Sequence, residues 1–230
     1  MSRTVGVLGG MGPAATLDFQ ARLLAATPAE RDQDHLRVIV DCNPKVPDRN
    51  AAIVGDGPSP GPMLAEMARG LERAGADFLV MPCNTAHAFA ADIRAAVAIP
   101  LISLIDETAN VAAAAAPGGK VGVLAVDGAR AARLYETALA EQGVTPVILG
   151  ADDQDRFMAC ISAIKAGDMG SSVRDEMAAL ARSLIAGGAT IVVAACTEIP
   201  LVLAPGDLDA PLIDSTAVLV ARTLDYAFGA

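Results

Sequence analysis

The stretch VGVLGGMGPAATLDF, residues Val5–Phe19, decides how this chain folds. An apolar run of strand length passes through glycines and a proline into an alanine-rich amphipathic segment. A continuous apolar run is typical of a strand that helices bury on both faces, as in a parallel sheet. Strand-like and helix-like segments go on alternating along the chain, which predicts the α/β class with mainly parallel sheets.

The opening stretch has a counterpart 116 residues later, where VGVLAVDGARAARLY begins at Val121. Two further segments recur in the same order: AGADFLVMPCNT matches GGATIVVAACTE 113 residues later, and IPLIS matches APLID 111 residues later. These matches predict two similar α/β/α domains related by a pseudo-two-fold duplication. We expect the first domain to comprise residues 1–100 completed by a C-terminal helix in 211–230, and the second to comprise residues 101–210.

Charge and composition argue against several classes of partner. The chain carries a net charge of −10, so bulk electrostatic attraction to nucleic acid or to an anionic membrane is not expected. No apolar stretch reaches the roughly 18–20 residues of a membrane-spanning helix, and the N-terminus lacks a signal-peptide pattern. We therefore expect a cytoplasmic protein with reduced thiols.

Motifs for metals and nucleotide cofactors are missing from the sequence. The four cysteines form no CxxC pair and the chain has two histidines, so a structural zinc site is not expected. Neither a GxGxxG nor a GxxxxGK[ST] motif marks a nucleotide site. The sequence thus predicts a protein that works without metal or cofactor.

Cys83 and Cys196 occupy the same place in the two halves, after an apolar strand and before an expected helix start, NTAH or TEIP. In open α/β sheets, ligands bind at the carboxyl ends of the strands. We expect the two thiols to meet in a cleft between the domains, where backbone N–H groups at the helix starts favour an anion. Cys42 and Cys160 lack such a counterpart, and packing is the interpretation for them.

Two opposed thiols suit the inversion of a carbon centre. One thiolate removes the α-proton from one face, and the opposite thiol returns a proton to the other face. A free thiol with a pKa of about 8.5 is only a few per cent ionised at pH 7, so a helix N-terminus or polar neighbours must lower that pKa. Structural packing and a disulfide are the alternative readings of the pair.

Five segments carry a family resemblance: GVLGGMGPAAT, NPKVPDRNAAI, ADFLVMPCNTAH, IKAGD and AACTEIPLVL. With these segments, spread over essentially the whole chain, the sequence resembles the aspartate/glutamate racemase superfamily, most closely its cofactor-independent aspartate and amino-acid racemases. The resemblance implies an isomerase that interconverts L- and D-aspartate or glutamate, with its active site in the interdomain cleft. It also implies a homodimer and no pyridoxal phosphate.

The resemblance implies roles for the residues around the two thiols. Cys83 and Cys196 would be the catalytic acid–base pair. Asn84, Thr85 and Thr197 would hold the α-carboxylate and the amino group of the substrate beside them.

Charged residues outside these loops bear on the substrate side chain. Arg49 of VPDRN and Lys165 of IKAG match positions that grip substrate carboxylates in aspartate-specific members, and a guanidinium fork suits bidentate binding. Two departures from that pattern weaken binding of an acidic side chain. Asn50 stands where a threonine is frequent, and Val126, Asp127, Gly128 and Ala129 stand where aspartate racemases tend to carry Thr-Gly-Thr.

The remaining site residues have supporting roles. Met11 and Gly12 would line the floor of the pocket. Glu198 would cap the turn after Cys196 or orient the site, and as an anion beside a thiolate it would raise the thiol's pKa. His87 is expected to support the loop of Cys83 rather than to act as a base.

Other functions remain open at this level. A hydantoin racemase, a maleate isomerase or an arylmalonate decarboxylase would belong to the same superfamily, although the last two typically rely on one cysteine. A two-domain protein that binds a small carboxylate would need the helix starts but not two opposed thiols.

Overall fold

The computed structural model describes residues 2–229. The chain divides into two compact units, Met1–Leu104 with Thr216–Ala230, and Ile105–Ser215. Each unit contains its own parallel sheet, so the predicted α/β class is confirmed. Within the described residues, no helix is long and apolar enough to cross a membrane.

The first unit is built on β1 (Val5–Gly9), which pairs in parallel with β2 (Val38–Cys42) on one side and with β3 (Phe78–Val80) on the other. Its described helices are α1 (Pro13–Ala26), η1 (Asp32–Asp34), α2 (Arg49–Val54), α3 (Gly61–Arg73), η2 (Thr85–Phe89), α4 (Ala90–Ala96) and α10 (Ser215–Phe228), where η marks a 3₁₀-helix.

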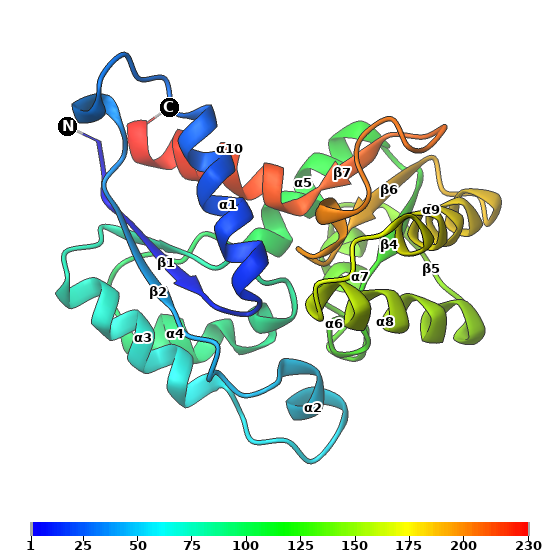
Figure 1. The fold of residues 1–230 in the computed structure, drawn as a ribbon, viewed down its shortest axis with the longest axis horizontal. Coiled ribbons are helices and arrows are strands. Elements are labelled where there is room, and N and C mark those ends of the chain that lie inside the picture. Colours follow the sequence, from blue (N-terminus) through cyan, green and yellow to red (C-terminus); the bar gives the residue numbers. More distant parts are fainter. Residues whose placement is uncertain (1, 230) are drawn as a thin grey trace. The chain divides into compact units, whose positions relative to one another are not determined.

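Strand β1 is buried on both faces because successive side chains point to opposite sides of the sheet. Val5 and Val7 pack with residues of α1 and α10, among them Phe19 and Leu219, whereas Leu8 packs with residues of α3 and α4. Figure 1 shows α1 and α10 on one side of this sheet and α3 and α4 on the other. The continuous apolar run of β1 follows from this double cover.

The C-terminal helix α10 completes the unit that contains the N-terminus. The Arg3 N–H donates to the Ala227 carbonyl at 2.9 Å, and the rings of Phe78 and Tyr226 lie 4.8 Å apart. Without α10, the aromatic ring of Phe78 and one face of β1 would lose apolar partners.

The second unit contains β4 (Lys120–Leu124), β5 (Thr145–Ile148), β6 (Ile191–Ala194) and β7 (Leu212–Asp214) in the parallel order β5-β4-β6-β7. Its described helices are α5 (Leu104–Ala115), α6 (Asp127–Ala131), α7 (Leu134–Glu141), α8 (Ala151–Lys165), α9 (Ser171–Ala186) and η3 (Ile199–Leu201). One continuous cluster of buried apolar side chains forms its core.

The register of the two sheets repeats with the spacing of the sequence matches. The corresponding pairs are Val5 with Phe78 and Val121 with Ile191, then Leu79 with Leu101 and Val192 with Leu212. Adding the spacing of the matching sequence segment, 116, 113 or 111 residues, to each residue of a pair in the first sheet gives the corresponding residue of the second sheet. The internal repeat is therefore found in the strand pairing as well as in the amino-acid sequence.

The glycine of each VGVL strand marks the closest approach of a helix to its sheet. A Cβ added to Gly6 would lie 3.2 Å from the Cβ of Leu71, and one added to Gly122 would lie 3.0 Å from the Cβ of Leu184. Both distances are tight for carbon atoms, so a larger residue would push α3 or α9 away from its sheet.

Candidate active site

The two cysteines lie at equivalent edges of the two sheets. Cys83 comes shortly after the end of β3, and Cys196 shortly after the end of β6. Both are free thiols, with 6% and 7% of the residue surface exposed. Each follows the strand that pairs with the VGVL strand of its sheet, β1 or β4, at the edge where α/β proteins bind ligands.

A helix begins after each cysteine, and its first turn is a 3₁₀-helix. Thr85–Phe89 and Ile199–Leu201 are short 3₁₀-helices rather than α-helices. A helix dipole sums over aligned peptide units, so such short turns contribute little to it. The 3₁₀-turn after Cys196 is therefore not expected to lower the pKa of that thiol.

His87 holds the Cys83 loop in place. Its Nδ1 lies 2.8 Å from the Cys83 carbonyl oxygen, and the Leu104 N–H donates to its Nε2 at 3.1 Å. Because Nε2 accepts, Nδ1 carries the ring proton and donates it to the carbonyl. Both ring nitrogens are thus committed to the backbone, as expected for a residue that supports the loop.

Cys196 forms a buried pair with Glu198. Its Sγ donates to the Glu198 carboxylate at 2.9 Å, and only 4% of Glu198 is exposed. Burial and then the Glu198 charge raise the pKa of the Cys196 thiol well above its ordinary value, while Lys165 acts weakly in the opposite direction. The Glu198 side chain makes no capping bond to η3, so orienting the thiol is the reading that the contacts support.

Behind Cys196 lies a buried tyrosine that sequence reasoning missed. The Tyr135 hydroxyl shares hydrogen bonds with the side chains of Thr108 and Ser215, and burial raises its pKa. Ser215 Oγ also donates to the carbonyl of Ala194, the last residue of β6, at 2.8 Å. The repeat could have indicated this residue, because Tyr135 stands where the first half has Phe19. A buried tyrosine hydroxyl, which phenylalanine lacks, needs hydrogen-bond partners.

In the first unit, Arg49 reaches the loop after β1. Its Nη2 donates to the Met11 carbonyl and its Nη1 to the Pro47 carbonyl, each at 3.3 Å. The Arg49 Nε is buried and has no partner among the described residues. Met11 belongs to the same buried cluster as Cys83, so the structure brings Arg49, Met11 and Cys83 into one region of this unit.

The other predicted site residues divide by burial. Asn84, Thr85 and Thr197 are buried beside the cysteines. Gly12 and Asn50 are half-buried next to Met11 and Arg49, whereas Lys165, the last residue of α8, is exposed.

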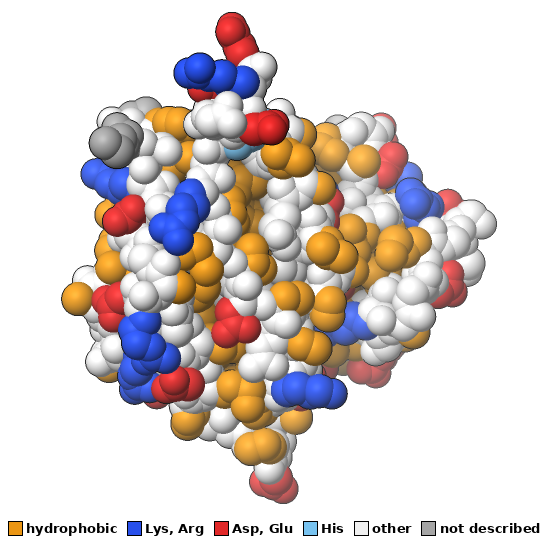
Figure 2. All heavy atoms as spheres, turned by 60° about the vertical axis from the view of Figure 1, so that its left-hand side comes forward, with side chains coloured by type: hydrophobic (Ala, Val, Ile, Leu, Met, Phe, Trp, Pro, Cys, Tyr) orange, Lys and Arg blue, Asp and Glu red, His pale blue; other side chains and the backbone are white. Residues whose placement is uncertain are grey.

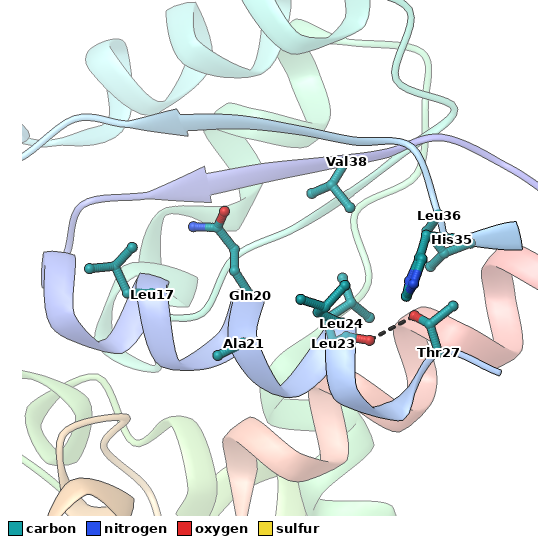
Figure 3. Close-up of a pocket in the computed structure, with 9 residues that line it drawn as sticks. All are labelled: Leu17, Gln20, Ala21, Leu23, Leu24, Thr27, His35, Leu36 and Val38. Atoms are coloured by element: carbon teal, nitrogen blue, oxygen red, sulfur yellow. Dashed lines mark hydrogen bonds between the residues drawn. The ribbon is translucent and has the colours of Figure 1, made fainter. Parts of the chain in front are cut away.

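A separate hollow lies on the first unit between α1 and the start of β2 (Figure 3). Its volume is about 400 Å³, and the residues that line it are Leu17, Gln20, Ala21, Leu23, Leu24, Thr27, His35, Leu36 and Val38. None of the predicted site residues lines it. The hollow is therefore distinct from the region around Cys83.

Neither sign of charge dominates the face drawn in Figure 2. Figure 2 shows lysine, arginine, aspartate and glutamate side chains interspersed among apolar ones on the face that it presents. Among residues 2–229, no three His, Cys, Asp or Glu side chains are grouped as a metal site would require.

Comparison with known proteins gives this arrangement a family. The model of the family described as Asp/Glu/Hydantoin racemase matches residues 8–223. The broad-specificity amino-acid racemase RacX of Bacillus subtilis (strain 168) is 26% identical to this chain, over 96% of both proteins.

Solved structures agree with that match. The Picrophilus torridus aspartate racemase has a TM-score of 0.88 and 30% identity, covering 98% of this chain and 94% of its own. A Francisella tularensis glutamate racemase, solved with D-glutamate, shares the fold at a TM-score of 0.71 and 20% identity, covering 99% of this chain and 82% of its own. With a family match over nearly its whole length and the fold of these enzymes, the chain is a racemase, and thus an isomerase, of the Asp/Glu/Hydantoin racemase family.

Proposed function

We propose that this racemase inverts the α-carbon of a free amino acid without a cofactor, with Cys83 and Cys196 as its two acid–base residues. The observation that supports this is the equivalence of the two thiols. Each is free, buried and placed after the strand that pairs with β1 or β4, the VGVL strand of its own sheet. A structural cysteine has no reason to recur at that edge in both halves.

The chemistry needs one thiol in each protonation state. Because burial and the Glu198 charge raise the pKa of Cys196, this residue would begin as the acid and Cys83 as the base. The Cys83 thiolate takes the α-proton, the C–H electron pair passes to the α-carbon, and the Cys196 S–H protonates the opposite face. The reverse reaction starts from the exchanged protonation states and uses the same groups.

The surrounding polar residues would bind the substrate. Asn84, Thr85 and Thr197 would hold the α-carboxylate and amino group, and the charge on the carboxylate would be stabilised as the carbanion forms. Arg49 and Lys165 are the cations that the family resemblance assigns to the carboxylates of aspartate or glutamate. The half-buried guanidinium of Arg49, with its Nε lacking a partner, supports a carboxylate ligand there.

The test is α-proton exchange in deuterated water, followed by NMR, on the L- and D-forms of aspartate, glutamate and neutral amino acids. Wild-type protein should exchange the α-proton and form the opposite enantiomer without added pyridoxal phosphate and in the presence of chelator. Cys83→Ala and Cys196→Ala should each lose racemisation by at least about 10²-fold, the usual contribution of a general acid or base. Cys160→Ala is the matched control, a buried cysteine of α8 away from both edges.

The single-thiol variants distinguish the two-base mechanism from its alternatives. A protein that keeps one thiol should still exchange the proton of one enantiomer, with retention, and each variant should act on a different enantiomer. Full racemisation by either variant, or equal loss in Cys160→Ala, would contradict the assignment of the two cysteines.

We also propose a cytoplasmic homodimer in which a second copy covers the hollow of Figure 3. Leu17 and Leu24, two turns apart on α1, are 65% and 60% exposed, and the rim continues to Val38 of the edge strand β2. No charged lysine, arginine, aspartate or glutamate lines the hollow, so two chains of net charge −10 meet there with little repulsion.

Light scattering after size exclusion measures the assembly. The wild type should be a dimer, and Leu24→Glu should shift it to the monomer. Val111→Glu introduces the same charge at an exposed apolar position outside the hollow and should leave the dimer intact. A monomeric wild type, or the same shift in both variants, would argue against this interface.

A further inference from the structure

The turn after β4 lies beside the Cys196 loop. The Ala195 N–H donates to the Leu124 carbonyl at 3.0 Å, so the two chains still run side by side where the strands end. Asp127 follows at the start of α6, about level with Cys196 on the neighbouring strand. Substituents of a substrate at Cys196 therefore lie within reach of this turn.

A buried glutamine holds the turn. Gln154 of α8 is only 6% exposed, and its Nε2 donates to Asp127 Oδ1 at 2.7 Å and to the Ala125 carbonyl at 3.0 Å. If the amide were rotated by half a turn, its oxygen would face the Asp127 carboxylate and the Ala125 carbonyl, which are both acceptors. The contacts therefore fix the orientation of the amide.

The Gln154 amide has no N–H group left for a ligand. Both N–H groups of the Gln154 amide are committed, and its Oε1 is buried without a donor among the described residues. The half-buried Asp127 carboxylate accepts a hydrogen bond from the neutral Gln154 amide. It has no ion pair with any described lysine or arginine. A ligand beside this turn therefore meets the Asp127 carboxylate, for which an N–H donor is the better match.

We propose that Asp127 and Gln154 make this racemase select amino acids whose side chains end in N–H donors over aspartate and glutamate. The inference rests on the proposed racemisation at Cys196 and deepens it by naming the substrate class. A second carboxylate would meet Asp127 as a like charge in a partly desolvated place, whereas an ammonium or amide group would donate to it. Lys165, the cation expected to attract an acidic side chain, is exposed at the far end of α8 from Gln154, although its charge still acts on Cys196.

Glutamine and glutamate provide the sharpest comparison because they have the same shape and differ in the donor. The ratio of kcat/KM for glutamine over glutamate, from α-proton exchange, should be at least tenfold in the wild type. Lysine and ornithine in the same panel separate a preference for a cation from a preference for an amide. Asp127→Asn removes the charge and should move the ratio toward glutamate by at least tenfold.

The control is Asp155→Asn, which removes the same charge at an exposed position of α8 one residue from Gln154. It should leave the ratio unchanged. A wild type that prefers glutamate, or a ratio that Asp127→Asn does not move, would overturn the proposal while leaving racemisation itself established.

Binding supplies a readout that does not depend on turnover. Calorimetric titration of the wild type with glutamine and with glutamate should give tighter binding of glutamine, and Asp127→Asn should reverse the order. If no amino acid is racemised, the proposed function fails and this titration decides the selectivity alone. Equal binding, or tighter binding of glutamate, would then refute the selectivity.

Discussion

Replacing Gly10 by alanine tests how the loop after β1 is built. Gly10 has φ +92°, and a Cβ there would lie 2.4 Å from the carbonyl carbon of Asn43 and 2.5 Å from its nitrogen. These are backbone atoms, so no rotamer change relieves the contact. The left-handed conformation costs an alanine about 1–2 kcal/mol, and overpacking costs typically ~1–3 kcal/mol. We therefore expect Gly10→Ala to lower the free energy of unfolding by about 2–5 kcal/mol.

Urea denaturation measures this change, and Gly118→Ala separates its two parts. Gly118 has φ +64°, but nothing lies within 4 Å of an added Cβ, so this variant should show the conformational cost of about 1–2 kcal/mol alone. Because Gly10 adjoins Met11, whose carbonyl accepts from Arg49, the folded fraction of Gly10→Ala should also lose racemase activity.

The reasoning would be refuted if the two alanine variants lost the same stability. That result would mean that the Asn43 segment moves freely away from the loop after β1. Loss of stability with full activity in the folded protein would separate the loop from substrate binding.

Three further substitutions test the neighbourhood of the thiols. Glu198→Gln removes a carboxylate that raises the pKa of Cys196, so the thiol will lose its proton at lower pH. The alkaline decline of racemase activity should therefore begin at a lower pH than in the wild type, and an unchanged pH–rate profile would contradict this. His87→Ala leaves two buried backbone groups without their partner, at roughly 1–3 kcal/mol each, and should lower the urea midpoint; an unaltered midpoint would show that water replaces the ring. Tyr135→Phe removes a buried hydroxyl and should cost about 1 kcal/mol in the same assay, and a gain in stability would argue against its hydrogen bonds.

Much of the site could be anticipated because it follows from the repeat. Apolar strands that end in a cysteine in both halves place Cys83 and Cys196 at the carboxyl edges of their sheets, and the parallel register bears this out. Arg49 was marked by its loop, and the structure adds its contact with the Met11 carbonyl. A helix begins after each cysteine as expected, and its first turn is of the 3₁₀ type, which local sequence does not distinguish from the first turn of an α-helix.

The partners of these residues could not be anticipated, because each depends on a contact between segments distant in sequence. The hydroxyls around Tyr135 come from α5 and the start of α10, and Gln154 reaches Asp127 from 27 residues away. Spacing does not encode such contacts. They appear only when burial forces polar groups to find one another.

The sequence by itself determined the α/β class, the duplication and the family, since these depend on periodicity and on motifs that local chemistry dictates. Tertiary structure alone decided that the Cys196 thiol donates to Glu198, that both His87 nitrogens are engaged by the backbone, and that the Asp127 carboxylate accepts from Gln154. The physical reason is that protonation and hydrogen-bond balance depend on burial and on neighbours in space. Folding is what brings those neighbours together.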